Sequence, residues 1–321
     1  MFNNSSKFSK AKLHFLAFFL TFIHLVKLAF TFWIPKKWKR IRGQLVLITG
    51  GSQGIGRALA FRFAKSGCNI AIASRNLDVG MKTAAEIGGK FKDVRVWAFA
   101  CDVSKPEEVR NLQKEIKKTL GTVDILVNNA GWLGVDHSLL EGNDETYQKM
   151  VDVNLTSYFW TARTFLPDMI RQKRGHIVAI SSSQFLDTFP NMVAYCTTKY
   201  GNTGFINSLR EEMCFYGYDE FIKCTAVHPT FIETNPELTK LHNGIFNENV
   251  FVLNDADEIA DMIVKGIRQD KFYVNVPCYD VLMCYASNRL PRHVKTRVVY
   301  EALRKDTRDQ YIENRRKKLN L

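Results

Sequence analysis

The sequence predicts a doubly wound α/β domain, in which a parallel β-sheet is covered by helices on both faces. From residue 44 onward, short apolar runs alternate with longer segments of helical periodicity. The runs are mostly apolar, as strands buried on both faces are. The segments between them have the length of the crossover helices that parallel strands require. We therefore expect a single folded unit over residues 43–280.

Each apolar run is a candidate strand, and each periodic segment is a candidate helix. The runs lie at residues 45–48, 70–73, 94–100, 123–127, 177–180, 221–227 and 272–276. Helical spacing is found at residues 55–65, 77–87, 156–171, 192–215 and 259–267. Ser104 and Glu107, with Pro106 between them, predict a capping box that opens a further helix ending near Leu120.

Charge and cysteine content restrict the class of protein. The net charge is +13 over 321 residues, and basic residues crowd the first 42 and the last 20 positions. This distribution suits a membrane surface, and no zinc-finger, helix-turn-helix or RNP-like pattern indicates nucleic acid. The seven cysteines form no CxxC pair. We therefore expect neither a metal site nor a disulfide framework, and a reducing compartment.

The N-terminal segment is predicted to hold the chain at a membrane. Residues 13–34 are mostly apolar and are followed by Pro35 and a basic cluster that ends at Arg42. The length fits a membrane-spanning helix, but His24 and Lys27 would be costly at the bilayer centre. A spanning anchor and an interfacial or hairpin anchor both remain open, whereas a cleaved signal peptide fits poorly. Residues 1–42 are thus predicted to be an anchor with a basic linker, and the charge imbalance favours a cytosolic catalytic domain.

A glycine-rich loop directly follows the first candidate strand and opens the first candidate helix. Its spacing is TGxxxGxG, from Thr49 to Gly56. The N-terminus of a helix binds phosphate, and glycines let the backbone approach a dinucleotide closely. A Rossmann-type fold is therefore expected. The cofactor contacts predicted in this loop are Thr49, Gly50, Ser52, Gln53, Gly54, Ile55 and Gly56.

The residues after the second candidate strand bear on the choice of cofactor. They are Ser74, Arg75 and Asn76, where an NAD enzyme usually places an acidic residue for the ribose hydroxyls. A guanidinium can instead bind a 2′-phosphate through two hydrogen bonds. This favours NADP(H), with NAD(H) possible, although Arg75 could also be an ordinary solvated surface residue.

Tyr195 and Lys199 are four residues apart in a helical pattern and therefore share one helix face. A tyrosine is a poor base at its free pKa of about 10, and a nearby ammonium group stabilises the phenolate. Alone, this pair is a weak indication of function, because surface Tyr and Lys share helix faces by chance.

Taken together and in order, the motifs of residues 43–275 resemble those of the short-chain dehydrogenase/reductase family. Besides the glycine loop and the Tyr–Lys pair, the matching features include an NNAG turn at 128–131, Asn154, and Ser182 thirteen residues before Tyr195. The resemblance implies further cofactor contacts, and the full set outside the glycine loop and residues 74–76 is Asp102, Val103, Asn129, Ala130, Gly131, Tyr195, Lys199, Pro229, Ile232 and Thr234.

The same resemblance implies the roles of four catalytic residues. Tyr195 would be the general acid/base, and Lys199 would lower its pKa and hold the nicotinamide ribose. Ser182 would hydrogen-bond the substrate oxygen, and Asn154 would hold a water of the proton relay. Ser182 has serines on both sides, so its assignment rests on spacing.

The N-terminal anchor, the basic linker and four short motifs resemble one branch of the family, which includes epidermal retinol dehydrogenases and lipid-droplet 17β-hydroxysteroid dehydrogenases. The motifs are Gly175–Val178, Ala194–Cys196, Val276–Pro277 and Leu290–Pro291. The resemblance implies a lipid-like alcohol or carbonyl substrate, and a location on the endoplasmic reticulum membrane or lipid droplets. Homodimers or homotetramers are common in the family. A substrate lid is expected at residues 229–253, and an apolar and basic C-terminal extension at 281–321. Arg75 departs from the acid usual in this branch.

Two further departures lie near the expected substrate side. Thr230 follows Pro229 where a glycine is usual, and Gln184 and Phe185 follow the serines where small residues are common. They bear on specificity rather than on the reaction. The alternative hypothesis is a scaffold on endoplasmic reticulum or lipid-droplet membranes that binds cofactor without turnover; the presence of all four catalytic residues argues against it.

Overall fold

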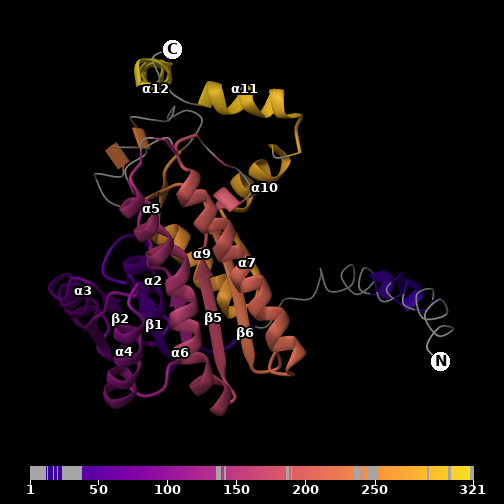
Figure 1. Cartoon of the computed structure of the whole chain (residues 1–321). Coiled ribbons are helices and arrows are strands. Elements are labelled where there is room, and N and C mark those ends of the chain that lie inside the picture. The colour runs from indigo at the N-terminus through magenta and orange to yellow at the C-terminus, as the bar shows by residue number, and fades with distance from the viewer. Residues whose placement is uncertain are drawn as a thin grey trace, which may run out of the picture. The chain divides into compact units, whose positions relative to one another are not determined.

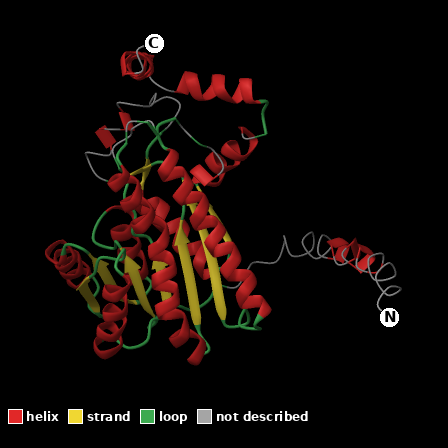
Figure 2. Ribbon diagram, in the orientation of Figure 1, coloured by secondary structure: helices red, strands yellow, loops and turns green. Residues whose placement is uncertain are grey.

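A parallel seven-stranded sheet organises the larger part of the chain (Figures 1 and 2). In the computed structural model the strand order is β3-β2-β1-β4-β5-β6-β9. The strands are β1 (Leu45–Thr49), β2 (Asn69–Ser74), β3 (Val96–Ala100), β4 (Ile125–Asn128), β5 (Gly175–Ile180), β6 (Ile222–Pro229) and β9 (Tyr273–Val276). The predicted parallel α/β sheet is thus confirmed, and each of the seven predicted apolar runs contributes a strand.

The structure describes residues 12, 14–16, 18–19, 21–23, 38–134, 139–140, 142–185, 188, 190–234, 239–240, 242–243, 252–287, 289–302 and 305–318. The chain divides into two units, Met1–Lys39 and Arg40–Leu321. The sheet and its helices belong to the second unit.

Helices cover both faces of the sheet, as the apolar strands predict. They are α2 (Gly54–Lys65), α3 (Leu77–Lys90), α4 (Pro106–Thr119), α5 (Asp144–Val151), α6 (Ser157–Arg171), α7 (Val193–Phe215) and α9 (Ala256–Arg268). Residues of α4, α6 and α7 form the core on one face, and residues of α2, α3 and α9 form the core on the other. Successive residues of a strand alternate between the two: Leu47 points to the first core and Ile48 to the second.

The strand order places a crevice at the centre of the sheet. Val46 of β1 pairs with Ile70 of β2 on one side and with Ile125 of β4 on the other. The chain therefore builds outward from β1 in one direction and then returns to build from β4 in the other. The loops after β1 and β4 leave in opposite directions, and ligands of open α/β sheets bind at such a switch point.

Two local features differ from the sequence expectation. The N-cap of α4 is Lys105, and no side chain caps it. The predicted capping box is therefore wrong, because the Ser104 hydroxyl donates to Asp102 Oδ1 over 2.7 Å instead. The predicted helix at 156–171 is preceded by α5 and by a π-helical turn at Asp152–Thr156 that were not anticipated.

The remaining elements are two short strands and three C-terminal helices. Short strand β7 (Ile232–Glu233) lies within the predicted lid and pairs with β8 (Asn254–Asp255), which directly follows the end of that lid. The chain ends in α10 (Cys278–Ser287), α11 (Arg292–Ala302) and α12 (Lys305–Lys318). Of the predicted lid, residues 235–238, 241 and 244–251 lie outside the described residues.

The predicted membrane anchor is only partly described. Its residues 13, 17, 20 and 24–34 lie outside the described part of the chain, and residues 14–16, 18–19 and 21–23 are helical. The described phenylalanines of this segment are exposed, with 71% of Phe15 and 72% of Phe18 accessible to solvent. A helix long and apolar enough to cross a bilayer is not found among the described residues.

Candidate active site

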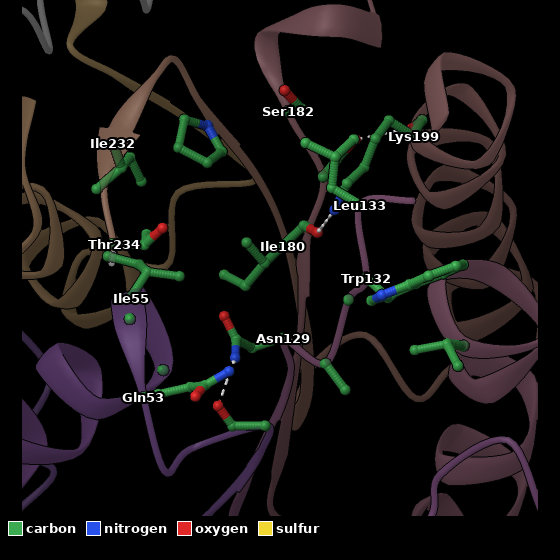
Figure 3. Close-up of a pocket in the computed structure, with 18 of the residues that line it drawn as sticks. Gln53, Ile55, Asn129, Trp132, Leu133, Ile180, Ser182, Lys199, Ile232 and Thr234 are labelled. Atoms are coloured by element: carbon green, nitrogen blue, oxygen red, sulfur yellow. Dashed lines mark hydrogen bonds between the residues drawn. The ribbon is translucent and has the colours of Figure 1, made fainter. Parts of the chain in front are cut away.

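A cavity of about 580 Å³ opens at the carboxyl ends of the central strands. Figure 3 shows Gln53 and Asn129 toward one end of it, and Ser182 and Lys199 toward the other. The cavity brings together most of the predicted cofactor residues: Gly50, Ser52, Gln53, Gly54, Ile55, Gly56, Ser74, Arg75, Asn76, Val103, Asn129, Ala130, Gly131, Tyr195, Lys199, Pro229, Ile232 and Thr234. Among the described residues, Thr49, Asp102 and Asn154 are the predicted site residues that do not line it.

At two glycines of the loop, an added side chain would come too close to neighbouring atoms. Gly54 has a φ of 54°, in the left-handed region that favours glycine, and a Cβ there would lie 3.2 Å from Thr234. A Cβ on Gly56 would collide with the carbonyl oxygen of Gly50 and lie 2.5 Å from Asn129 Nδ2. The loop thus forms a cradle of bare backbone at the start of α2, which suits a dinucleotide pyrophosphate.

Thr49 supports the floor of the cavity from behind. Its side chain is 1% exposed, and its Oγ1 accepts hydrogen bonds from the backbone N–H groups of Asn129 at 2.9 Å and Ala130 at 3.0 Å. The Asn129 amide nitrogen donates to the carbonyl oxygens of Thr49 and Gly50. Asn129 Oδ1 is buried with no hydrogen-bond partner among the described residues. An unpaired buried acceptor at this wall fits a bound polar ligand.

The residues at and after the end of β2 line the cavity near the glycine loop. Ser74 Oγ lies 3.0 Å from Ser52 Oγ, and the Asn76 side chain caps α3 by accepting from Val79 N. Arg75 is exposed and lines the cavity here. No carboxylate stands at positions 74–76, so this wall presents a single positive charge.

Asp102 lies beyond the cavity lining, whereas Val103 reaches it. The Asp102 carboxylate accepts from both the backbone and the hydroxyl of Ser104, and its backbone N–H donates to Glu108 Oε2 at 2.7 Å. These bonds fix the turn between β3 and α4. In the described structure its carboxylate therefore orders the turn that holds Val103 at the cavity.

Tyr195, Lys199 and Ser182 meet at the other end of the cavity. Lys199 is 5% exposed, its Nζ donates to the Ile180 carbonyl oxygen over 3.1 Å, and it lies 5.5 Å from the centre of the Tyr195 ring. Burial lowers the pKa of Lys199 to about 8. Burial also raises the pKa of Tyr195, as does Cys196, while the hydrogen bond with the Ser182 hydroxyl lowers it. The expected net lowering of the Tyr195 pKa is therefore not found, and Tyr195 is a neutral phenol at neutral pH, able to donate a proton.

Asn154 is placed by the π-helical turn and is fully buried. Its amide binds the backbone of Trp132 twice: Oδ1 accepts from Trp132 N at 2.7 Å, and Nδ2 donates to Trp132 O at 2.9 Å. A Cβ on Gly131 would lie 3.7 Å from Asn154 Oδ1 and 3.9 Å from Lys199 Nζ. Asn154 therefore sits directly behind the cavity wall, beside Lys199.

A buried polar network that the sequence did not suggest holds the helix that carries Lys199. The Lys199 carbonyl oxygen accepts from Ser181 Oγ at 2.7 Å and from Thr203 Oγ1 at 3.3 Å. Thr203 in turn lies 3.2 Å from His228 Nε2, and His228 Nδ1 lies 2.9 Å from Asn275 Oδ1. Burial lowers the pKa of His228 to about 4, so the ring is neutral. The network links α7 to β5, β6 and β9.

The substrate end of the cavity contains Gln184, which the sequence placed there, together with side chains that it did not all assign individually. The apolar side chains that line it beside Ser182 and Tyr195 are Trp132, Leu133, Met192, Phe231 and Leu253, with His242 and Gln184 among them. A signal for Trp132 was available, because a large aromatic residue directly follows the NNAG turn. Leu253 and His242 could not be assigned from spacing, since they enter from the lid.

Known proteins share this architecture and these motifs. A family model described as short chain dehydrogenase matches residues 44–242. The human (Homo sapiens) epidermal retinol dehydrogenase 2 is 33% identical over 264 residues, which cover 80% of this chain and 82% of that protein. Estradiol 17-beta-dehydrogenase 11 of Mus musculus is 31% identical over 271 residues, which cover 83% of this chain and 85% of that protein.

A solved structure agrees with both. The alcohol dehydrogenase from the archaeon Thermococcus sibiricus, complexed with 5-hydroxy-NADP, is similar with a TM-score of 0.62 and 25% identity, covering 73% of this chain and 95% of that one. The family model matches more than half of the chain, and relatives above 30% identity are matched over most of their length. The chain therefore belongs to the short-chain dehydrogenase/reductase family and is an oxidoreductase.

Proposed function

We propose that this enzyme interconverts lipid-like alcohols and carbonyl compounds, with NADP(H) as the carrier of the hydride. The observation that carries the proposal is the convergence of Ser182, Tyr195 and Lys199 at one end of a cavity whose other end is the glycine cradle. The cradle, the unpaired Asn129 Oδ1 and the buried Lys199 are the residues that would hold the dinucleotide.

In the direction of reduction, the protein must give a proton to the carbonyl oxygen. The Tyr195 phenol is the donor, since its raised pKa keeps it protonated until charge develops on the substrate oxygen. Ser182 hydrogen-bonds the same oxygen and stabilises that charge. The Lys199 ammonium, 5.5 Å from the tyrosine ring centre, stabilises the phenolate that is left.

The role of Asn154 is to position the groups around it. Because its amide is bound to both backbone groups of Trp132, it fixes the turn at Gly131 that faces Lys199. A water held beside Asn154 would return a proton to the site through Lys199. The π-helical turn supports this role, because such turns occur often at functional sites.

The substrate class follows from the lining of the cavity. Trp132, Leu133, Met192, Phe231 and Leu253 give the end beside Ser182 an apolar wall, as a lipid-like substrate requires. The relatives named as retinol and estradiol dehydrogenases point in the same direction. We infer a retinoid, steroid or another hydrophobic alcohol or carbonyl.

The preference for NADP(H) is supported by Arg75. It lines the loop end of the cavity beside Ser74 and Asn76, where no acidic residue would repel a 2′-phosphate. A guanidinium can bind such a phosphate through two hydrogen bonds.

Membrane association is proposed from the N-terminal segment. Its described helical residues expose Phe15, Phe18, Phe19 and Phe22, and the basic cluster at 36–42 follows. Exposed aromatic side chains next to basic residues suit a bilayer interface. We infer binding to the endoplasmic reticulum membrane or to lipid droplets, with a cytosolic catalytic unit.

Deletion of residues 1–39 tests membrane association. Loss of sedimentation with membranes on this deletion would support it, and retention would argue against it.

Turnover by the membrane-bound protein tests the central proposal. NADPH and NADH are each combined with retinal, ketosteroids and long-chain carbonyls, and the oxidised cofactors with the corresponding alcohols. Tyr195→Phe serves as the matched control, because it removes one hydroxyl and keeps the ring. We expect turnover that falls by about 100-fold or more in this variant. Turnover that survives the substitution would refute the assigned acid, and cofactor binding without any turnover would favour the scaffold.

A further inference from the structure

Gln184 carries a primary amide into the otherwise apolar substrate end of the cavity. Its side chain lines the cavity and is only 4% exposed. It belongs to the short 3₁₀ turn Ser183–Phe185 that follows β5. Its backbone N–H donates to Ser182 Oγ over 3.3 Å. Gln184 is therefore held beside the hydroxyl that is proposed to bind the reacting oxygen.

The hydrogen bonds of this amide, within the described residues, are made to sulfur. Gln184 Nε2 donates to Met192 Sδ at 3.8 Å, and Gln184 Oε1 accepts from Cys196 Sγ at 4.0 Å. A thioether is a weak acceptor and a thiol a weak donor. Burying an amide without strong partners is unfavourable. Both ends of the amide thus keep most of their capacity for a stronger partner in the cavity.

Packing alone does not account for the amide. A methionine of similar length would fill the space between Met192 and Cys196 without bringing a polar group out of water. The neighbouring Ser181, by contrast, uses its hydroxyl on the Lys199 carbonyl and on Thr203. The amide is therefore best explained by a ligand group that both accepts and donates.

We propose that Gln184 forms a subsite for a hydroxyl on the carbon next to the reacting carbon, so that α-hydroxy carbonyls and vicinal diols are favoured substrates. This deepens the proposed function and rests on it, because Ser182 marks where the reacting oxygen lies. A hydroxyl accepts from Nε2 and donates to Oε1, which matches both ends of the amide. A charged group is not expected, since Met192 and Cys196 offer it no counter-ion.

Binding without turnover tests the subsite directly. An alcohol cannot be reduced by NADPH, so a long-chain secondary alcohol and the vicinal diol of the same chain can be titrated into the NADPH-loaded enzyme by calorimetry. The Gln184→Met variant should raise the diol-to-alcohol ratio of dissociation constants about tenfold, the net worth of a hydrogen bond of ordinary strength. In Met192→Leu, which alters the apolar wall and keeps the amide, both dissociation constants are expected to change, whereas their ratio should remain that of the wild type.

Two results would overturn the subsite. One is a ratio in Gln184→Met equal to that of the wild type. The other, which needs no variant, is weaker binding of the diol than of the alcohol by the wild type, as expected if the added hydroxyl entered the apolar wall unpaired. Thermal unfolding of each variant shows whether the fold is intact.

Turnover separates this inference from the proposed function. A long-chain ketone and the same ketone with a neighbouring hydroxyl are compared with NADPH. Wild-type reduction of both ketones, with kcat/KM falling by the same factor for each in Gln184→Met, would reject the subsite and keep the oxidoreductase. Failure to reduce either ketone, with a Gln184-dependent preference for the diol in binding, would reject the reaction and keep the subsite.

Discussion

Thr49→Val should destabilise the enzyme strongly although it removes a single oxygen atom. The Thr49 hydroxyl is fully buried and accepts the backbone N–H groups of Asn129 and Ala130 at 2.9 and 3.0 Å. Valine has nearly the same shape and accepts neither. Leaving a buried donor unpaired costs about 1–3 kcal/mol. For two donors we expect the free energy of unfolding to fall by about 2–6 kcal/mol.

Urea unfolding followed by tryptophan fluorescence measures the change, with Thr49→Ser as the matched control. Serine keeps the accepting oxygen and loses only a methyl group, so it should cost about 1 kcal/mol or less. The two variants must show the same dependence of free energy on urea for the comparison to hold. A loss in Thr49→Val within about 0.5 kcal/mol of that in Thr49→Ser would refute the reasoning, because the hydroxyl would then not matter.

Three further outcomes are expected. Burial lowers the pKa of Lys199 from 10.5 to about 8, so between these pH values the unfolded chain binds more protons than the folded chain. The free energy of unfolding should therefore rise with pH across this window, by up to about 3 kcal/mol relative to Lys199→Met. Urea titrations at several pH values measure this rise. Gly56→Ala should weaken NADPH binding at least about tenfold in fluorescence titrations, because the added Cβ collides with the Gly50 carbonyl. Arg75→Asp should lower the NADPH-to-NADH ratio of kcat/KM about tenfold or more in steady-state assays; an unchanged ratio would reject the proposed phosphate contact.

The sheet was predictable because its central strands β1, β2, β4 and β5 are almost wholly buried on both faces. Such strands are mostly apolar in sequence, and each of the seven runs became a strand within about two residues of its expected ends. The helix ends were harder. Ser104 has the sequence position of a cap, yet its hydroxyl is used by Asp102, and Lys105 takes the cap position. Competition for one hydroxyl between two local partners cannot be decided from spacing.

The site was predictable where residues close together in the sequence line the same part of the cavity. Spacing placed Ser182, Tyr195 and Lys199 together, and the glycine pattern placed the cradle. It could not show that Thr49 serves the backbone of Asn129 and Ala130 rather than the cavity itself. That distinction depends on which way the side chain of the last residue of β1 points. The contribution of His228 was equally hidden, since it reaches the Lys199 carbonyl only through Thr203.

The burial of Lys199 explains why so much polar structure lies behind the site. A buried ammonium is unfavourable, as the lowered pKa of Lys199 shows. The Ile180 carbonyl offsets part of this cost directly. Contacts that hold α7 in place keep the ammonium buried against the rest of this cost. The hydrogen bonds from Ser181 and Thr203 to the Lys199 carbonyl oxygen are such contacts. Loosening α7 would let the ammonium move into water and away from the Tyr195 ring, whose centre lies 5.5 Å from Lys199 Nζ in the structure. The polar network therefore keeps the Lys199 ammonium buried, although burial by itself disfavours the charged form.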